Sequence, residues 1–279
     1  MLRTRTHPAA SPDWLPIAVG VLSTVMILLL LLPLLALLWR AVSAIDGSFK
    51  LDASPIVSAL GLSLGTTAVS TLIIFLLGTP LALALARYDF PLKRVLTVLV
   101  EIPIVMPPVV AGLALLAAFG RRGLIGASLA SVGISVTFTW TAVVLAQVFV
   151  AVPFYIRAAQ SRFKALPQDL AAAASIDGAN HWQTFWHITL PLSRPALLAG
   201  LILSWARALG EFGATILFAG NLQGRTQTMP LLVYGALEQD LRAAYATAVL
   251  LLTLAALALF ATRWLTKLDA TQADPLADA

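Results

Sequence analysis

Cysteine is absent from the 279-residue chain, and charged residues are scarce. Without cysteine there can be no disulfide framework, no thiol nucleophile and no metal site built on thiolates. Lys, Arg, Asp and Glu make up only 11% of the residues, whereas an ordinary soluble domain has roughly 25%. The composition therefore excludes an ordinary soluble globular protein and gives no indication of redox chemistry.

The chain also lacks the sequence motifs of nucleotide-binding proteins and hydrolases. No Gly-x-x-x-x-Gly-Lys-Ser/Thr loop, nucleophile elbow or paired-carboxylate pattern occurs in it. We therefore predict that the chain is not an enzyme and that it binds no ATP or other cofactor.

Apolar residues make up 59% of the chain, and they gather in runs long enough to cross a bilayer, which takes about 20 residues. The second and fourth runs begin with residues rich in Gly, Ser and Pro, which favour loops, so we start those helices later. The predicted organisation is an N-terminal tail (1–14), a transmembrane domain (15–265) and a C-terminal tail (266–279). We predict an all-α integral membrane protein with about six transmembrane helices, at 15–39, 60–86, 102–120, 135–156, 195–220 and 243–262.

The positions of Lys and Arg predict the orientation, because short cytoplasmic loops carry an excess of these residues. With both termini in the cytoplasm, the inner side holds Arg3, Arg5, Arg87, Lys93, Arg94, Arg157, Arg162, Lys164, Arg194, Arg263 and Lys267, and the outer side holds Arg40, Lys50, Arg121, Arg122, Arg225 and Arg242. The same bias explains the net charge of +5 through topology and anionic lipid. We predict a multi-pass protein of the cytoplasmic membrane with no nucleic-acid partner.

The longest predicted cytoplasmic connection lies between the fourth and fifth spans and contains residues 166–191. Pro167 and Asp169 suit the first turn of a helix. The alanine run that follows favours helix and offers almost no side chain; it includes Ala172, Ala173 and Ala174. Gly178, directly after Asp177, suits a left-handed end to this helix.

A second, amphipathic helix is expected over 180–190, because Trp182, Phe185 and Trp186 recur at helical spacing. Pro191 is expected to end it, and its tryptophans suit a membrane interface. The pattern alone fits either an elbow that merely links two spans or a docking element for another protein.

Two charged residues interrupt the predicted fifth span. Arg207 and Glu211 are four residues apart, so they share a helical face and can pair. A charge at mid-bilayer costs at least about 2.5–3.5 kcal/mol on insertion scales, which makes such a pair a functional hypothesis. The pair fits either a purely structural role or a role in a translocation pathway or gate.

Proline and glycine also gather at membrane depth. Pro103, Pro107 and Pro108 leave carbonyls unsatisfied in the predicted third span, and such backbone tends to line a cavity or meet another helix. Small residues allow helices to approach closely, and the candidates are Gly112, Gly210 and Gly213. Packing is the simpler role for these residues, and a place along a pathway is the alternative.

Three other ionisable residues have simpler interpretations. Glu101 is a candidate for a proton relay, but an interfacial cap or a pair with Arg94 is the favoured interpretation. His181 and His187 have no third ligand nearby, so they form a poor metal pattern and we predict no metal site.

At the 166–191 segment the sequence resembles the membrane-spanning permeases of binding-protein-dependent ABC importers. Their cytoplasmic signature is Glu-Ala-Ala, three residues, Gly, nine residues, then Ile-x-Leu-Pro. The matching positions here are Ala173, Ala174, Gly178, Ile188, Leu190 and Pro191. The position of the signature glutamate is Ala172, and Asp169 lies on nearly the same helical face as a candidate substitute.

Three further stretches resemble the molybdate and sulfate branch of these permeases. They are EIPIVMPPVVAGLALLAAFGRRGLIG (101–126), ARALGEFGATILFAG (206–220) and TQTMPLLVYGALE (226–238). With the 166–191 segment, the resemblance covers most of residues 60–262.

The resemblance implies a permease subunit of an importer for molybdate or tungstate. It implies a homodimer that works with two cytoplasmic ATPase subunits, which hold the ATP and Mg, and with an external oxyanion-binding protein. The 166–191 segment is then the coupling loop, and Arg207 suits an oxyanion in charge and donor geometry.

Three alternatives stay open. A sulfate or thiosulfate permease shares the motif of the fifth span. A proton-coupled secondary transporter would use Glu101, Arg207 and Glu211, although no internal repeat of the kind many such carriers show is evident. A membrane-embedded enzyme is the weakest of the three, because no catalytic constellation lies at either interface.

Overall fold

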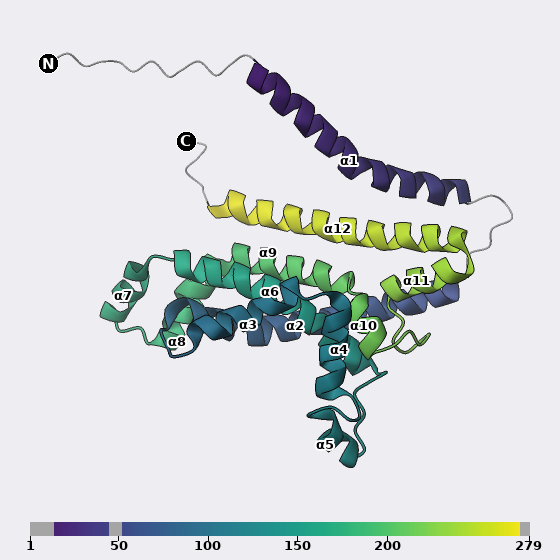
Figure 1. The fold of residues 1–279 in the computed structure, drawn as a ribbon. Helices are drawn as coiled ribbons and strands as arrows, with labels where there is room; N and C mark the ends of the chain where they lie inside the picture. Colours follow the sequence, from purple (N-terminus) through teal and green to yellow (C-terminus); the bar gives the residue numbers. More distant parts are fainter. Residues whose placement is uncertain (1–13, 45–51, 274–279) are drawn as a thin grey trace. The chain divides into compact units, whose positions relative to one another are not determined.

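The structure is a computed structural model that describes residues 14–44 and 52–273, all of whose regular elements are helices (Figure 1). It divides into two compact units, residues 1–50 and 51–279. The helices long and apolar enough to span a membrane are 16–44, 53–87, 140–165 and 181–209, and shorter apolar helices lie at 108–119 and 241–257. The prediction of an all-α integral membrane protein is confirmed.

The first unit contains a single described helix, α1 (Trp14–Ala44). Its apolar side chains are exposed along nearly the whole helix, and Pro33 lies in its interior. Such a surface is stable only where lipid or another apolar surface covers it.

Three long helices, α2 (Ala53–Arg87), α6 (Trp140–Ala165) and α9 (Leu190–Leu209), pack side by side in the second unit (Figure 1). The predicted start of the second span at residue 60 is too late, because Asp52 accepts a hydrogen bond from the Ser54 amide and caps the helix earlier. The fourth span starts at Trp140 instead of 135, since Thr139 caps it, and it continues beyond 156.

The predicted third span (102–120) is two helices. α3 (Lys93–Val105) and α4 (Pro108–Phe119) are separated at Met106 and Pro107, and α4 turns away from the direction of α3 (Figure 1). Neither Pro107 nor Pro108 has an amide hydrogen, so a continuous helix would lose two bonds and clash with the preceding turn. The short helix α5 (Gly126–Ser131) follows α4.

The predicted fifth span (195–220) is broken as well. α9 ends at Leu209, and α10 (Gly213–Phe218) begins after a three-residue gap that contains Glu211. α11 (Met229–Gln239) and α12 (Leu241–Ala273) complete the chain, and α12 packs against α9 and α11. α12 continues past the domain boundary that we predicted at 265.

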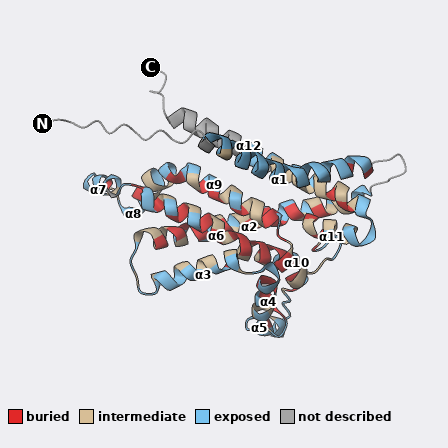
Figure 2. Cartoon of the chain, turned by 45° about the horizontal axis from the view of Figure 1, so that its top comes forward, coloured by how far each residue is buried: buried red, intermediate tan, exposed pale blue. Residues whose placement is uncertain are grey.

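The core has two clusters, and α6 contributes to both. Its first half packs with α4 and α10 around Val143, Ala146 and Phe218. Its second half packs with α2 and α9 around Tyr155 and Phe163. Buried residues therefore follow α6 and the faces of α2 and α9 turned toward it, while α7 is mostly exposed (Figure 2).

Candidate functional site

The 166–191 segment forms two short helices joined by a sharp turn. α7 (Gln168–Ile176) ends where Gly178 adopts φ +84°, a left-handed conformation that favours glycine. Asn180 then begins α8 (His181–Thr184) with a reciprocal capping box: its side chain accepts from the Gln183 amide, and the Gln183 side chain accepts from the Asn180 amide, each at 2.9 Å. The predicted elbow with a left-handed turn is present.

Pro191 does not end the second helix, which corrects our prediction. α8 continues through a π-helical turn, η1 (Phe185–Thr189), directly into α9. The Leu190 amide bonds to the carbonyl of Phe185, five residues back. A wider turn before a proline relieves the ring clash with the carbonyl four residues back, so the helix bends around Pro191 instead of stopping.

The residues of the importer signature divide into an exposed and a packed group. Ala172, Ala173, Asp177 and Gly178 are exposed, and so is Asp169 in the first turn of α7. Ala174 is buried at 8% exposure, while Ile188 and Leu190 are partly buried. The elbow therefore presents small side chains and two carboxylates outward, while its other face packs on the protein.

Arginine side chains tie both ends of this segment to the bundle. The Arg162 guanidinium donates from Nε and Nη2 to the Leu192 carbonyl, at 3.1 and 2.7 Å. Arg87, at the end of α2, donates to the Leu166 carbonyl at 3.3 Å. Because the Leu192 carbonyl accepts two hydrogen bonds from one guanidinium, both its distance from Arg162 and its orientation are fixed.

Replacing Arg162 with glutamine should loosen the segment. Hydrogen bonds from a charged donor are worth about 1.5–3 kcal/mol when shielded and less at an exposed site, so we expect a loss of about 1 kcal/mol. A loss of this size raises the population of the opened segment about fivefold, so chymotrypsin should cleave at Trp182 or Phe185 about five times faster. Lys164→Gln is the matched control, because it removes an exposed charge from the same helix end. Equal cleavage of both variants would contradict the anchoring role.

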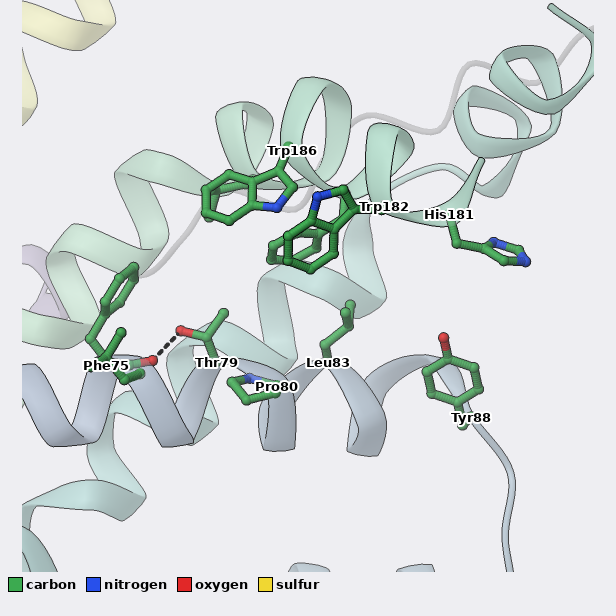
Figure 3. A pocket seen from close by; sticks show the side chains of 11 residues that line it. Phe75, Thr79, Pro80, Leu83, Tyr88, His181, Trp182 and Trp186 are labelled. Carbon is green, nitrogen blue, oxygen red and sulfur yellow. Dashed lines mark hydrogen bonds between the residues drawn. The ribbon is translucent and has the colours of Figure 1, made fainter. Parts of the chain in front are cut away.

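A second feature of the segment is its aromatic face. The rings of Trp182, Phe185 and Trp186 contact one another with centroids 5.5–6.4 Å apart. They face α2 across an apolar groove (Figure 3). The predicted aromatic face thus exists, and an open groove separates it from α2.

Arg207 and Glu211 form the expected ion pair, but not within one helix. The Arg207 Nη1 atom lies 2.8 Å from Glu211 Oε2, and the Glu211 side chain is only 1% exposed while that of Arg207 is 29% exposed. Glu211 Oε1 accepts from the Ala214 amide at 2.8 Å. The carboxylate therefore holds the broken backbone together, joining the end of α9 to the first turn of α10.

The glycine positions fall into two classes. A Cβ on Gly213 would lie 2.5 Å from the Pro108 Cβ, and one on Gly112 would lie 2.9 Å from the Leu217 Cβ. α4 and α10 therefore meet at backbone distance, as predicted for small residues. Gly210 is different: the nearest atom to its Cβ would be the Ala206 carbonyl at 3.7 Å, so the prediction of close approach is wrong there.

The prolines of the broken span are placed differently from one another. Pro103 lies inside α3 and is buried, whereas Pro107 and Pro108 are exposed at the start of α4. Pro108 touches Gly213, so the two helix breaks, at 106–107 and 210–212, meet in space. Sequence analysis predicted irregular backbone at these prolines, but it predicted a continuous fifth span, so it missed the break at 210–212 and the contact between the two breaks.

Glu101 pairs with Arg157 of α6, at 3.7 Å, and not with Arg94. The helical registers of α3 and α6 decide this choice. Among the described residues, no group of three His, Asp or Glu is arranged to hold a metal. Sequence analysis missed the roles of Arg87 and Arg162, because their acceptors are main-chain carbonyls, which carry no sequence signal.

The fold and these features define an all-helical integral membrane protein with broken spans and an exposed two-helix elbow. Residues 75–270 match the family of binding-protein-dependent transport system inner membrane components, and the chain belongs to that family. It is 46% identical over 200 residues to the molybdenum transport system permease protein ModB of Mycobacterium bovis, covering 72% of this chain and 76% of that protein.

Other relatives extend this similarity. The Haemophilus influenzae molybdenum permease ModB is 42% identical over 218 residues, covering 76% of this chain and 93% of that protein. The sulfate permease CysW of Synechococcus elongatus is 41% identical over 194 residues, covering 70% and 68%. A bacterial alginate ABC importer shares the fold with a TM-score of 0.69 at 18% identity, over 90% of this chain and 96% of that chain.

Proposed function

We propose that this chain is the permease subunit of an ATP-driven importer that carries molybdate, or tungstate, across the cytoplasmic membrane. The observation that carries the substrate assignment is the 46% identity to a molybdenum permease over 72% of the chain. No ATP-binding motif occurs in the sequence, so the energy comes from a partner ATPase with its ATP and Mg.

The elbow formed by α7 and α8 is the proposed coupling site for that ATPase. Its alanines allow another protein's backbone to approach closely, and its carboxylates at Asp169 and Asp177 offer charged contacts. The Arg87 and Arg162 hydrogen bonds hold the ends of the segment on α2 and α6. Because η1 passes without interruption into α9, a displacement of the elbow would move the helix that ends at the Arg207–Glu211 pair.

The proposed gate is the place where the two helix breaks meet. Pro107 and Pro108 lie on one side of it, and Gly210, Glu211 and Gly213 on the other. Discrete breaks in packed helices allow two backbone arrangements, which a transporter that alternates between inward- and outward-facing states needs. In this proposal Arg207 attracts the oxyanion transiently, while its bond to Glu211 limits how tightly the anion is held.

The working assembly proposed is a homodimer with two ATPase subunits and an extracytoplasmic oxyanion-binding protein, with both termini in the cytoplasm. Family membership supports a binding-protein partner. A solved alginate ABC transporter of the same fold, whose structure includes a substrate-bound periplasmic protein, supports the same arrangement.

Sulfate is the second candidate substrate, favoured by the 41% identity to a sulfate permease. ATP hydrolysis in liposomes that contain this chain, its ATPase and its binding protein distinguishes the two. Molybdate and tungstate should each stimulate hydrolysis at least about tenfold more than sulfate, which a binding difference of 1.4 kcal/mol gives. Greater stimulation by sulfate would reassign the substrate, and transport that persists on a proton gradient without ATP would contradict an ATP-driven importer.

The Asp169→Ala variant, measured in the same system, tests whether Asp169 replaces the missing signature glutamate. We expect it to reduce substrate-stimulated hydrolysis while the chain still assembles with the ATPase. Unchanged stimulation would remove Asp169 from the coupling site.

A further inference from the structure

A groove of about 400 Å³ lies between α2 and the aromatic face of the elbow (Figure 3). Two roughly parallel rows of side chains form its walls. One row consists of Phe75, Leu76, Thr79, Pro80 and Leu83 of α2 with Tyr88 directly after it, and the opposite row consists of His181, Trp182, Phe185, Trp186 and Leu190. Among residues 52–273, no side chain fills the space between them.

The groove has the length of one bilayer leaflet. Phe75 and Tyr88 mark its ends on α2, and a helical rise of about 1.5 Å per residue places them about 20 Å apart. One leaflet is about 15 Å thick in its hydrocarbon part and about 20 Å thick with its headgroup region. Tyr88 directly follows the last residue of α2, so that end of the groove lies at the membrane interface and Phe75 lies deeper.

The groove is too narrow for a helix. The whole empty space of the groove, its open side included, is about 940 Å³, and over about 20 Å of length this gives a mean cross-section of about 47 Å². An α-helix with its side chains is about 10 Å across and needs about 80 Å². A polymethylene chain, whose carbon atoms contact neighbours at about 4 Å, needs about 20 Å².

The groove is apolar along its length and polar at one end, which matches the acyl chain and the headgroup of an amphiphile. The Thr79 hydroxyl in the floor donates to the Phe75 carbonyl at 2.6 Å and lies 2.5 Å from the Tyr155 hydroxyl, so it needs no partner from the groove. Tyr88 and His181 lie together at the interfacial end (Figure 3). Beyond Tyr88, Lys93 pairs with Asp89 at 2.9 Å, and its hydrogen bond, together with its charge, holds the pKa of that carboxyl below its ordinary value.

We propose that this groove binds one acyl chain of a membrane phospholipid, with the headgroup at the Tyr88 and His181 end. The bound chain lies along the groove between α2 and the elbow and fixes the depth of Trp182 and Trp186 in the membrane. Its preference over bulk lipid comes from contact with the aromatic walls, because transfer from lipid to the groove gains no hydrophobic free energy. The proposal depends on membrane location alone, not on the transported substrate.

Native mass spectrometry of the full chain, purified in mild detergent from membranes, tests the proposal. About one retained phospholipid per chain is expected. Leu83→Trp fills the groove and should lower retention about tenfold, the scale set by one overpacked side chain. Leu77→Trp is the matched control, because Leu77 lies on α2 outside the groove at 68% exposure and its variant should retain the lipid. Equal retention in both variants overturns the proposal.

A photo-crosslinking amino acid at Leu83 gives an answer that does not depend on the tryptophan variant. The protein is reconstituted in vesicles of phosphatidylethanolamine and phosphatidylglycerol and irradiated. A product heavier by the mass of one phospholipid supports the groove as an acyl-chain site. A crosslink to a second copy of the chain shows instead that a neighbouring protomer occupies the groove, and it overturns the lipid assignment.

Discussion

Arg207→Leu should destabilise the protein by about 3–5 kcal/mol, the usual cost of leaving one partner of a buried ion pair without the other. The Glu211 carboxylate interacts with Arg207 across 2.8 Å, and its side chain is only 1% exposed. Without Arg207, hydration by water therefore cannot replace the lost stabilisation of its charge. The measurement is the midpoint of thermal unfolding in detergent, followed by the rate of oxyanion uptake in liposomes.

The double variant Arg207→Leu with Glu211→Gln is the control. Glutamine keeps an acceptor for the Ala214 amide but removes the stranded charge, so most of the lost stability should return. Transport then separates the two roles of the pair. Recovery of uptake along with stability indicates a structural pair, whereas stable protein without uptake indicates that Arg207 contacts the anion. Wild-type stability of the single variant would contradict the buried-charge argument.

Gly213→Ala should cost about 1–3 kcal/mol, the range for overpacking a tight contact. The added Cβ would lie 2.5 Å from the Pro108 Cβ and 3.3 Å from its carbonyl carbon, and the backbone of Pro108 cannot give way as a flexible side chain would. α4 and α10 would have to separate. Uptake should fall with stability, because this contact joins the two helix breaks.

Gly210→Ala is the matched control, three residues away. Its added Cβ would meet nothing closer than 3.7 Å, and Gly210 has φ −84°, which alanine adopts freely. Alanine there should leave stability unchanged or raise it by about 0.4–1 kcal/mol through the unfolded state. If Gly210→Ala lowered the stability as much as Gly213→Ala does, the two glycines would be required for their backbone freedom and not for close helix approach.

Three glycines near the helix breaks could not be told apart from the sequence. Gly112, Gly210 and Gly213 have the same local signal, a glycine within an apolar run, and the sequence gives no basis for separating them. The structure separates them: Gly112 faces atoms of α10 and Gly213 faces atoms of α4, whereas Gly210 has only the Ala206 carbonyl of its own helix nearby. The same limit applies to Glu101, whose partner is Arg157 because α3 packs beside α6.

Helix boundaries were predictable where a local chemical cause sets them. Gly178 ends α7 because glycine accepts the left-handed conformation, and Pro107 with Pro108 breaks the third span because neither has an amide hydrogen. Pro191 has the same deficiency, yet the helix continues through η1 into α9. Leu190 packs on the core cluster around Tyr155 and Phe163. Arg162 of α6 holds the Leu192 carbonyl, so contacts with residues far away in the chain support the continued helix.

The sequence by itself determined the membrane class, the helical fold, the elbow at 166–191 and the pairing of Arg207 with Glu211. Each of these follows from hydrophobic run length, local conformational preference or a spacing of four residues. Only the tertiary structure decided that the two helix breaks meet at Pro108 and Gly213, that Arg87 and Arg162 hold the ends of the elbow, and that a narrow groove remains beside α2. Those features depend on which helix faces join, and contact between distant segments is set by packing of the whole bundle rather than by any local pattern.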